Sequence, residues 1–174
     1  MKLAARLIRL YFIIFILHSS VLGNNCSDEE LNKLGMLDGP DFEKEKLFAA
    51  SHGLGKVGKN FGLKIKPKVD HILNDIMKVF GEYGIEGVSA KCLPCFAQSL
   101  LCFLQNCRGP CLGDPCSEGC QNCFKRNCEE GLLKCIGKDK IKNPCDYGGE
   151  YLKYKPQKTD GDESAKKGEA SGTS

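Results

Sequence analysis

The chain has 174 residues but no tryptophan, and aromatic residues make up only 8% of it. Between residues 91 and 143 it also has few β-branched residues and no run in which polar and apolar residues alternate, so strands are not favoured. This composition predicts a mainly helical protein without a large continuous core. Small secreted domains with poor cores commonly depend on disulfides for their stability.

Long apolar runs are absent except at the N-terminus. The segment from Leu10 to Leu17 follows three basic residues, and a suitable cleavage site lies between Gly23 and Asn24. These features predict that residues 1–23 are a signal peptide. The run is far shorter than the roughly 20 residues that span a bilayer, and the C-terminus lacks the hydrophobic tail of a GPI signal. We therefore expect a secreted protein without a stable membrane anchor.

Excess charge is also absent once the signal peptide is set aside. The whole chain has 25 Lys and Arg against 22 Asp and Glu, and residues 1–23 contain three basic residues and no acidic one. The remaining chain therefore carries 22 charges of each sign. A balanced charge removes the electrostatic reason to expect nucleic acid or an anionic membrane as a partner.

Residues 24–90 are patterned as helices. Ser27 and Glu30 form a possible capping box before a short helix over residues 28–37. A second helix is predicted over residues 41–51. The clearest one begins at Pro67 and carries an apolar stripe at helical spacing as far as Phe80. We expect this stripe to pack on the cysteine-rich region that follows.

Residues 91–145 form that cysteine-rich region, which holds eleven of the twelve cysteines. One helical segment follows Pro94, and a second is predicted from Asp114 to about Asn127, with Asp114 as its N-cap. The expected fold is a partly helical hairpin held by disulfides. Residues 146–174 are polar and are predicted to be a disordered tail.

All twelve cysteines are predicted to form disulfides, and their gaps are nearly mirrored about Gly113 and Asp114. Mirrored gaps indicate nested bridges between two antiparallel segments. The preferred register also closes the long loop between the N-terminus and the end of the cysteine-rich region. Its pairs are Cys111–Cys116, Cys107–Cys120, Cys102–Cys123, Cys95–Cys128, Cys92–Cys135 and Cys26–Cys145.

A shifted register is the alternative. It leaves Cys26, Cys92, Cys116 and Cys145 to pair among themselves, and we prefer the first register because it uses every cysteine in one nested scheme. The shifted pairs are Cys107–Cys123, Cys102–Cys128, Cys95–Cys135 and Cys111–Cys120.

Two chemical alternatives involve the same cysteines. Cys92-Leu93-Pro94-Cys95 is similar to the redox site of thioredoxin-type proteins, in which the helix N-terminus lowers the pKa of the first thiol. No strand precedes the motif here, so structural bridges are the preferred interpretation. Together with Cys120 and Cys123, the same pair could bind zinc through four thiolates. A signal peptide argues against free thiolates.

Other motifs are incomplete. Gly53 to Asn60 is nearly a phosphate-binding loop, but Asn60 stands where Ser or Thr is needed, so we interpret this segment as a Gly/Lys-rich connector. His71 lies beside Asp70 on the helix after Pro67, but that helix has no cysteine to match the secreted phospholipases with a His–Asp pair. We expect no catalytic residue, no metal and no cofactor.

Asn25-Cys26-Ser27 is the sequon for N-glycosylation. Its distance of two residues from the cleavage site argues against its occupancy, as does the expected disulfide at Cys26. Asn25 is therefore a candidate acceptor that we expect to be poorly used.

The signal peptide, the cysteines between Cys92 and Cys145 and the Lys-rich tail together resemble small secreted cysteine-rich proteins of apicomplexan parasites. The resemblance implies storage in an apical secretory organelle or display at the parasite surface or vacuole. We expect a non-enzymatic interaction protein that presents a disulfide-rigidified surface to a protein partner, with Arg108, Lys125 and Arg126 as candidate contacts. The alternatives are a thiol–disulfide oxidoreductase and, less favoured, a four-cysteine zinc protein.

Overall fold

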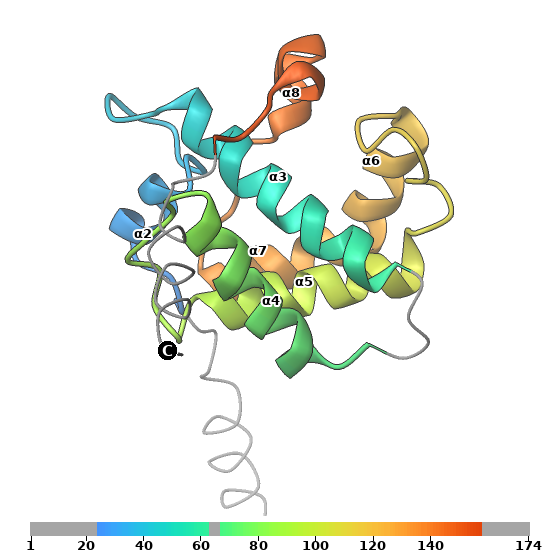
Figure 1. The fold of residues 1–174 in the computed structure, drawn as a ribbon, viewed down its shortest axis with the longest axis horizontal. Coiled ribbons are helices and arrows are strands. Elements are labelled where there is room, and N and C mark those ends of the chain that lie inside the picture. The colour runs from blue at the N-terminus through green and yellow to red at the C-terminus, as the bar shows by residue number, and fades with distance from the viewer. Residues whose placement is uncertain (1–23, 63–66, 158–174) are drawn as a thin grey trace, which may run out of the picture.

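The computed structural model describes residues 24–62 and 67–157, and the regular structure in these ranges is entirely helical (Figure 1). The predicted mainly α fold is confirmed. The predicted signal peptide and residues 158–174 of the predicted tail lie outside the described residues. The elements are α2 (Asp28–Lys33), α3 (Lys44–Phe61), α4 (Val69–Glu82), α5 (Leu93–Asn106), α6 (Glu118–Phe124), the π-helical turn η1 (Lys125–Glu129), α7 (Glu130–Ile136), the 3₁₀ turn η2 (Pro144–Tyr147) and α8 (Gly149–Lys153).

The first helix begins at the predicted capping box. The Ser27 hydroxyl accepts a hydrogen bond from the Glu30 backbone N–H at 3.2 Å, and the Glu30 carboxylate accepts one from the Ser27 N–H at 2.7 Å. These two bonds satisfy donors that the first turn of a helix otherwise leaves unpaired. The N-terminus of α2 is therefore fixed by its own sequence.

Helix α4 also follows its sequence pattern. It begins two residues after Pro67 and buries Ile72, Ile76 and Phe80. It packs against both α3 and α5, so the predicted contact with the cysteine-rich region is confirmed. Met77, which belongs to the predicted stripe, is instead 46% exposed.

The predicted connector over residues 53–60 is wrong, because this segment is the second half of α3. Gly53 and Gly58 are buried where neighbouring helices approach closely. A Cβ on Gly53 would lie 3.2 Å from the Phe80 ring, and one on Gly58 would lie 3.3 Å from a methyl group of Leu100. These packing contacts outweigh the low helix propensity of glycine. The helix predicted to end at residue 51 therefore continues to Phe61.

A single buried cluster joins α2, α3, α4, α5, α7 and α8. Its fully buried members include Leu31, Leu47, Ile72, Phe96 and Ile136. The prediction that the protein lacks a large continuous core was therefore wrong. Aromatic residues are few, but the aliphatic stripes of several helices converge on one centre, and buried half-cystines fill the space between them.

The predicted start of the tail at residue 146 is also wrong, because helical structure continues to Lys153 and Tyr154 packs on α3. Tyr147, Tyr151 and Tyr154 pack around Phe48 of α3, with ring centroids 5.4–5.6 Å apart. Aromatic pairs at this separation contribute beyond the area that they bury. These ring contacts, the Cys116–Cys145 bridge and the ion pair between Lys44 and Glu150 together hold η2 and α8 against the rest of the protein.

The hairpin consists of α5 and the continuous run α6–η1–α7, which returns beside it (Figure 1). The second arm begins at Glu118, later than predicted, and its N-cap is Ser117. Asp114, the predicted N-cap, instead accepts a hydrogen bond from the Cys116 N–H at 2.8 Å and shapes the turn before the helix. The arm extends beyond Asn127 as far as Ile136.

Candidate interaction surface

All twelve cysteines are bridged in six disulfides, so the site prediction that each is a half-cystine agrees with the structure. Four bridges follow the shifted register and are nested across the hairpin, and we refer to these four as the nested disulfides. They are Cys95–Cys135, Cys102–Cys128, Cys107–Cys123 and Cys111–Cys120. The preferred register was wrong.

Helix geometry explains why the shifted register is formed. Cys95 and Cys102 are seven residues apart, and so are their partners Cys135 and Cys128. At a rise of about 1.5 Å per residue, equal gaps keep the bridges level along the two arms. Between Cys102–Cys123 and Cys95–Cys128, the preferred register would set seven residues against five, which is a mismatch of about 3 Å.

The π-helical turn η1 accommodates the five-residue gap between Cys123 and Cys128. In a regular α-helix, residues five apart point about 140° away from each other. The wider i→i+5 turn of a π-helix brings such residues back toward one face. Both cysteines consequently reach partners on the other arm, at Cα–Cα distances of 5.6 and 5.8 Å. In the sequence, this pairing is indicated by the equal five-residue gaps from Cys102 to Cys107 and from Cys123 to Cys128.

The predicted Cys26–Cys145 bridge is also wrong. Cys26 is joined to Cys92, which ties the start of the described chain to the beginning of α5. Cys145 is joined to Cys116, which ties the segment after α7 to the other end of the hairpin. Each end of the hairpin thus has one bridge to a segment outside it.

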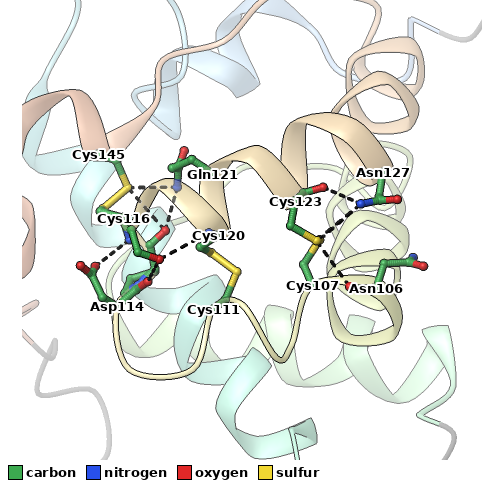
Figure 2. Close-up of a disulfide and its surroundings, with 12 residues drawn as sticks. Asn106, Cys107, Cys111, Asp114, Cys116, Cys120, Gln121, Cys123, Asn127 and Cys145 are labelled. Atoms are coloured by element: carbon green, nitrogen blue, oxygen red, sulfur yellow. Dashed lines mark hydrogen bonds between the residues drawn. A yellow bond between two sulfur atoms is a disulfide. The ribbon is translucent and has the colours of Figure 1, made fainter.

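The loop between the hairpin arms is held at three points (Figure 2). We define the tip loop as residues 108–116, between the C-cap of α5 and the N-cap of α6. Cys107–Cys123 closes its base, and Cys111–Cys120 and Cys116–Cys145 hold its interior. No residue of the tip loop belongs to the buried core. The tip loop is therefore an exposed segment with a covalently fixed backbone.

Polar contacts reinforce the second half of the tip loop. The Gln121 amide donates to the Pro115 carbonyl at 2.7 Å and accepts from the Asn143 amide at 2.6 Å. Its nitrogen also lies 3.3 Å from the Cys145 sulfur, as Figure 2 shows. Gln121 thus connects α6, the tip loop and the segment leading to Cys145.

The candidate contact residues are all exposed. Arg108 is the first residue of the tip loop, and Lys125 and Arg126 lie in η1. Arg126 donates from Nε to the Asn122 carbonyl of its own arm at 3.1 Å. Lys125 and Asn24 both line an open depression of about 630 Å³. Arg108 does not line this depression.

The cysteines of the redox and zinc alternatives are occupied in structural bridges. Cys92 and Cys95 are 0% and 1% exposed and are bonded to Cys26 and Cys135, so they do not form a bridge with each other. Cys120 and Cys123 are bonded to cysteines at the tip of the hairpin. Within the described ranges, no group of three or more His, Cys, Asp and Glu residues is placed to hold a metal ion.

The two histidines within the described residues lie on different helices. His52 of α3 places Nε2 3.1 Å from the Tyr151 carbonyl oxygen, and its ring packs on Tyr151 at a centroid distance of 4.9 Å. His71 and Asp70 are exposed on α4. The structure therefore gives His52 a packing role against α8 and leaves His71 at the surface.

Asn25 contacts the Cys95–Cys135 bridge. Its side-chain nitrogen lies 3.5 Å from the Cys135 sulfur and 3.8 Å from the Cys95 sulfur, and its backbone N–H donates to the Cys135 carbonyl at 3.2 Å. The Asn25 nitrogen is the atom that would carry a glycan, and Ser27 of the sequon caps α2. Both sequon side chains thus have structural contacts.

The pKa of the Glu30 carboxyl is strongly lowered. Burial acts to raise its pKa, but hydrogen bonds from Ser89 and Ser27 outweigh this effect and lower the pKa to about 2. The Ser89 N–H donates to the carboxylate at 2.7 Å. Glu30 therefore links α2 to the segment before α5, close to the Cys26–Cys92 bridge.

The fold defines a disulfide-rich helical protein, and six bridges are typical of chains that fold in an oxidising compartment. Among the described residues, no helix combines the length and apolar character needed to cross a membrane. No family model, curated protein or solved structure matches the chain significantly.

Proposed function

We propose that this chain is a secreted, non-enzymatic interaction protein that presents the disulfide-held end of its hairpin to a protein partner. Its resemblance to secreted apicomplexan proteins supports a site of action at a parasite surface, in a vacuole or in an apical secretory organelle. The observation that carries the proposal is the tip loop, which is exposed except at its two partly buried cysteines, Cys111 and Cys116, and is fixed by three disulfides.

Cys111–Cys120, in the interior of the tip loop, encloses the shortest loop of the six bridges and contributes least to stability in the chain-entropy model. Cys111–Cys120 encloses a separation of nine residues, whereas Cys26–Cys92 encloses 66. In the chain-entropy model these loops correspond to about 2.7 and about 4.4 kcal/mol. The more specific effect of Cys111–Cys120 is to order an exposed loop. Ordering a loop in advance lowers the entropic cost of binding a partner.

The oxidoreductase alternative has less support. It requires Cys92 and Cys95 to exchange a disulfide with a substrate, and a reactive cysteine needs a partly exposed thiolate. Both residues are buried in separate bridges that fasten α5 to the N-terminus and to α7. Reduction of these bridges would loosen the fold itself.

The test is a binding measurement on the oxidised protein. Residues 24–174 are immobilised either oxidised or reduced and alkylated, and the proteins retained from a secreted or cell-surface fraction are compared. We expect a saturable, stoichiometric partner that binds only the oxidised form. Absence of any such partner, together with catalytic turnover of a dithiol substrate by the oxidised protein, would favour the oxidoreductase instead.

A further inference from the structure

We propose that the Cys116–Cys145 bridge is a thiol–disulfide exchange site. A dithiol reductant of the thioredoxin class opens it, while the other five bridges stay closed. This inference does not rest on the proposed binding function, because it concerns what opens a bridge of the fold and not what the tip loop contacts. Exposed disulfides are in general the labile and regulatory ones, whereas structural bridges resist reduction.

Access to the sulfurs distinguishes this bridge from the others. Of the six bridges, all of which lie within the described residues, Cys116–Cys145 is the only one in which neither half-cystine is buried. Each of the other five has at least one half-cystine that is 5% exposed or less. Exchange requires an attacking thiolate to reach a sulfur of the bridge, so access limits its rate. The buried half-cystines are Cys26, Cys92, Cys95, Cys107, Cys120, Cys123 and Cys128.

A hydrogen-bond donor beside the bridge favours Cys145 as the leaving sulfur. The Gln121 side-chain nitrogen lies 3.3 Å from the Cys145 sulfur and can donate to the thiolate that forms there (Figure 2). A donor of this kind stabilises the thiolate, and a better stabilised thiolate leaves faster. The Pro115 carbonyl and the Asn143 amide hold the Gln121 amide in place at 2.7 and 2.6 Å.

Opening of the bridge takes two exchange steps. The thiolate of the reductant attacks the Cys116 sulfur, which forms a mixed disulfide and expels Cys145 as a thiolate that takes up a proton. The second thiol of the reductant, as its thiolate, then attacks the sulfur of the reductant in the mixed disulfide and releases Cys116 as a thiol. The bridge gains two electrons and two protons, and the dithiol becomes a disulfide. The Pro115 carbonyl oxygen lies 3.9 Å from the Cys145 sulfur and can accept the new S–H.

The bridge acts as a latch on the last part of the described chain. Cys145 is the only cysteine after Cys135, so no other bridge ties η2 and α8 to the hairpin. The tyrosines of this part of the chain cover Phe48 of α3, which is 3% exposed. Ring contacts remain after reduction, so η2 and α8 open more often without being lost from α3. Reduction of one bridge therefore loosens the cover of Phe48 and leaves the nested disulfides intact.

The experiment follows the reduction of the oxidised chain, residues 24–174. Catalytic thioredoxin, thioredoxin reductase and NADPH supply the dithiol, and thiols are alkylated at intervals and located by peptide mass spectrometry. Because access limits the exchange, we expect Cys116 and Cys145 to become thiols at least about tenfold faster than any other pair. Earlier opening of any other bridge, or opening of all six together, would overturn the proposal.

Two controls test the assignment of the site. Cys111→Ser/Cys120→Ser removes the other bridge in the interior of the tip loop and should still open first at Cys116–Cys145. A thioredoxin variant that lacks its second cysteine should be trapped as a mixed disulfide on Cys116. Trapping on Cys145 would contradict its role as the leaving sulfur, and trapping on a cysteine of another bridge would overturn the site itself.

Hydrogen exchange tests the latch. In Cys116→Ser/Cys145→Ser, the amides of α8 should exchange at least about tenfold faster than in the wild type, because the covalent constraint on their opening is lost. The amides of α5 and α7 should keep their wild-type rates. Unchanged exchange in α8 would overturn the latch. Faster exchange in α5 and α7 as well would show that the bridge supports the whole fold, which would overturn it too.

Discussion

Cys102 on α5 and Cys128 in the π-helical turn η1 are joined across the hairpin at a Cα–Cα distance of 5.8 Å. Each lies seven residues from one neighbouring nested disulfide and five residues from the other. This symmetry keeps the bridges level along both arms. The π-helical turn in the second arm thus lets Cys123 and Cys128 both reach partners on α5 or at its C-cap.

Removal of Cys102–Cys128 should destabilise the protein more than removal of Cys111–Cys120. The bridges enclose separations of 26 and nine residues, so the chain-entropy model gives losses of about 3.5 and about 2.7 kcal/mol. The paired variants Cys102→Ala/Cys128→Ala and Cys111→Ala/Cys120→Ala are compared by equilibrium urea unfolding. A larger loss in the second pair would contradict the placement of the tip loop outside the core.

Gly137→Ala should destabilise the protein by about 1–2 kcal/mol or more. Gly137 ends α7 with a φ of +74°, and a Cβ there would lie 2.8 Å from the Cα of Asn24. Gly131→Ala is the matched control within α7, because nothing lies within 4 Å of its added Cβ. That control should gain about 0.5–1 kcal/mol. Equal effects of the two changes on the melting temperature would refute the contact between α7 and the N-terminal segment.

Glu30→Gln should reduce the loss of stability at acidic pH. The folded-state pKa of Glu30 is lowered from 4.5 to about 2, so its ionised form stabilises the fold above about pH 4.5. This contribution is lost as the pH falls from 4.5 toward 2. Melting temperatures measured across that range should therefore fall less steeply in Glu30→Gln than in the wild type. Glu29→Gln removes the same charge one residue earlier, from a side chain that pairs with Lys33 instead of Ser27 and Ser89, and is the matched control for loss of charge.

Asn25 should carry no glycan in the folded, secreted protein. Its side-chain nitrogen faces the sulfurs of the Cys95–Cys135 bridge, so a sugar on this atom would compete with that contact. Protein secreted from a eukaryotic host should keep its electrophoretic mobility after treatment with an endoglycosidase, as Asn25→Gln should. A mobility shift confined to the wild type would show that the amide turns outward.

The sequence was sufficient to predict the helices whose signals are local. The capping box at Ser27 and the apolar stripe of α4 depend on residues within a few turns of each other, and both predictions were confirmed. The second half of α3 could not be predicted in this way. Gly53 and Gly58 become favourable only because α4 and α5 lie against them.

The disulfide pairing shows the same division between local and tertiary information. The mirrored gaps correctly indicated a hairpin with nested bridges, and both registers could be written from the sequence. The choice between them depended on having the same number of residues, and so the same helical rise, between successive bridges on the two arms. The matching five-residue gaps agree with the π-helical turn that aligns Cys123 with Cys128, but they do not specify it.

The most direct test of the nested disulfides is a digest that cuts after Arg108, Glu118 and Lys125 without reduction, followed by mass spectrometry. Peptide 109–118 contains Cys111 and Cys116, and peptide 119–125 contains Cys120 and Cys123. The structure predicts that the two peptides remain linked through Cys111–Cys120 and separate only on reduction. Release of peptide 109–118 by itself, with an internal Cys111–Cys116 bridge, would contradict the structure and the fixed tip loop that it presents.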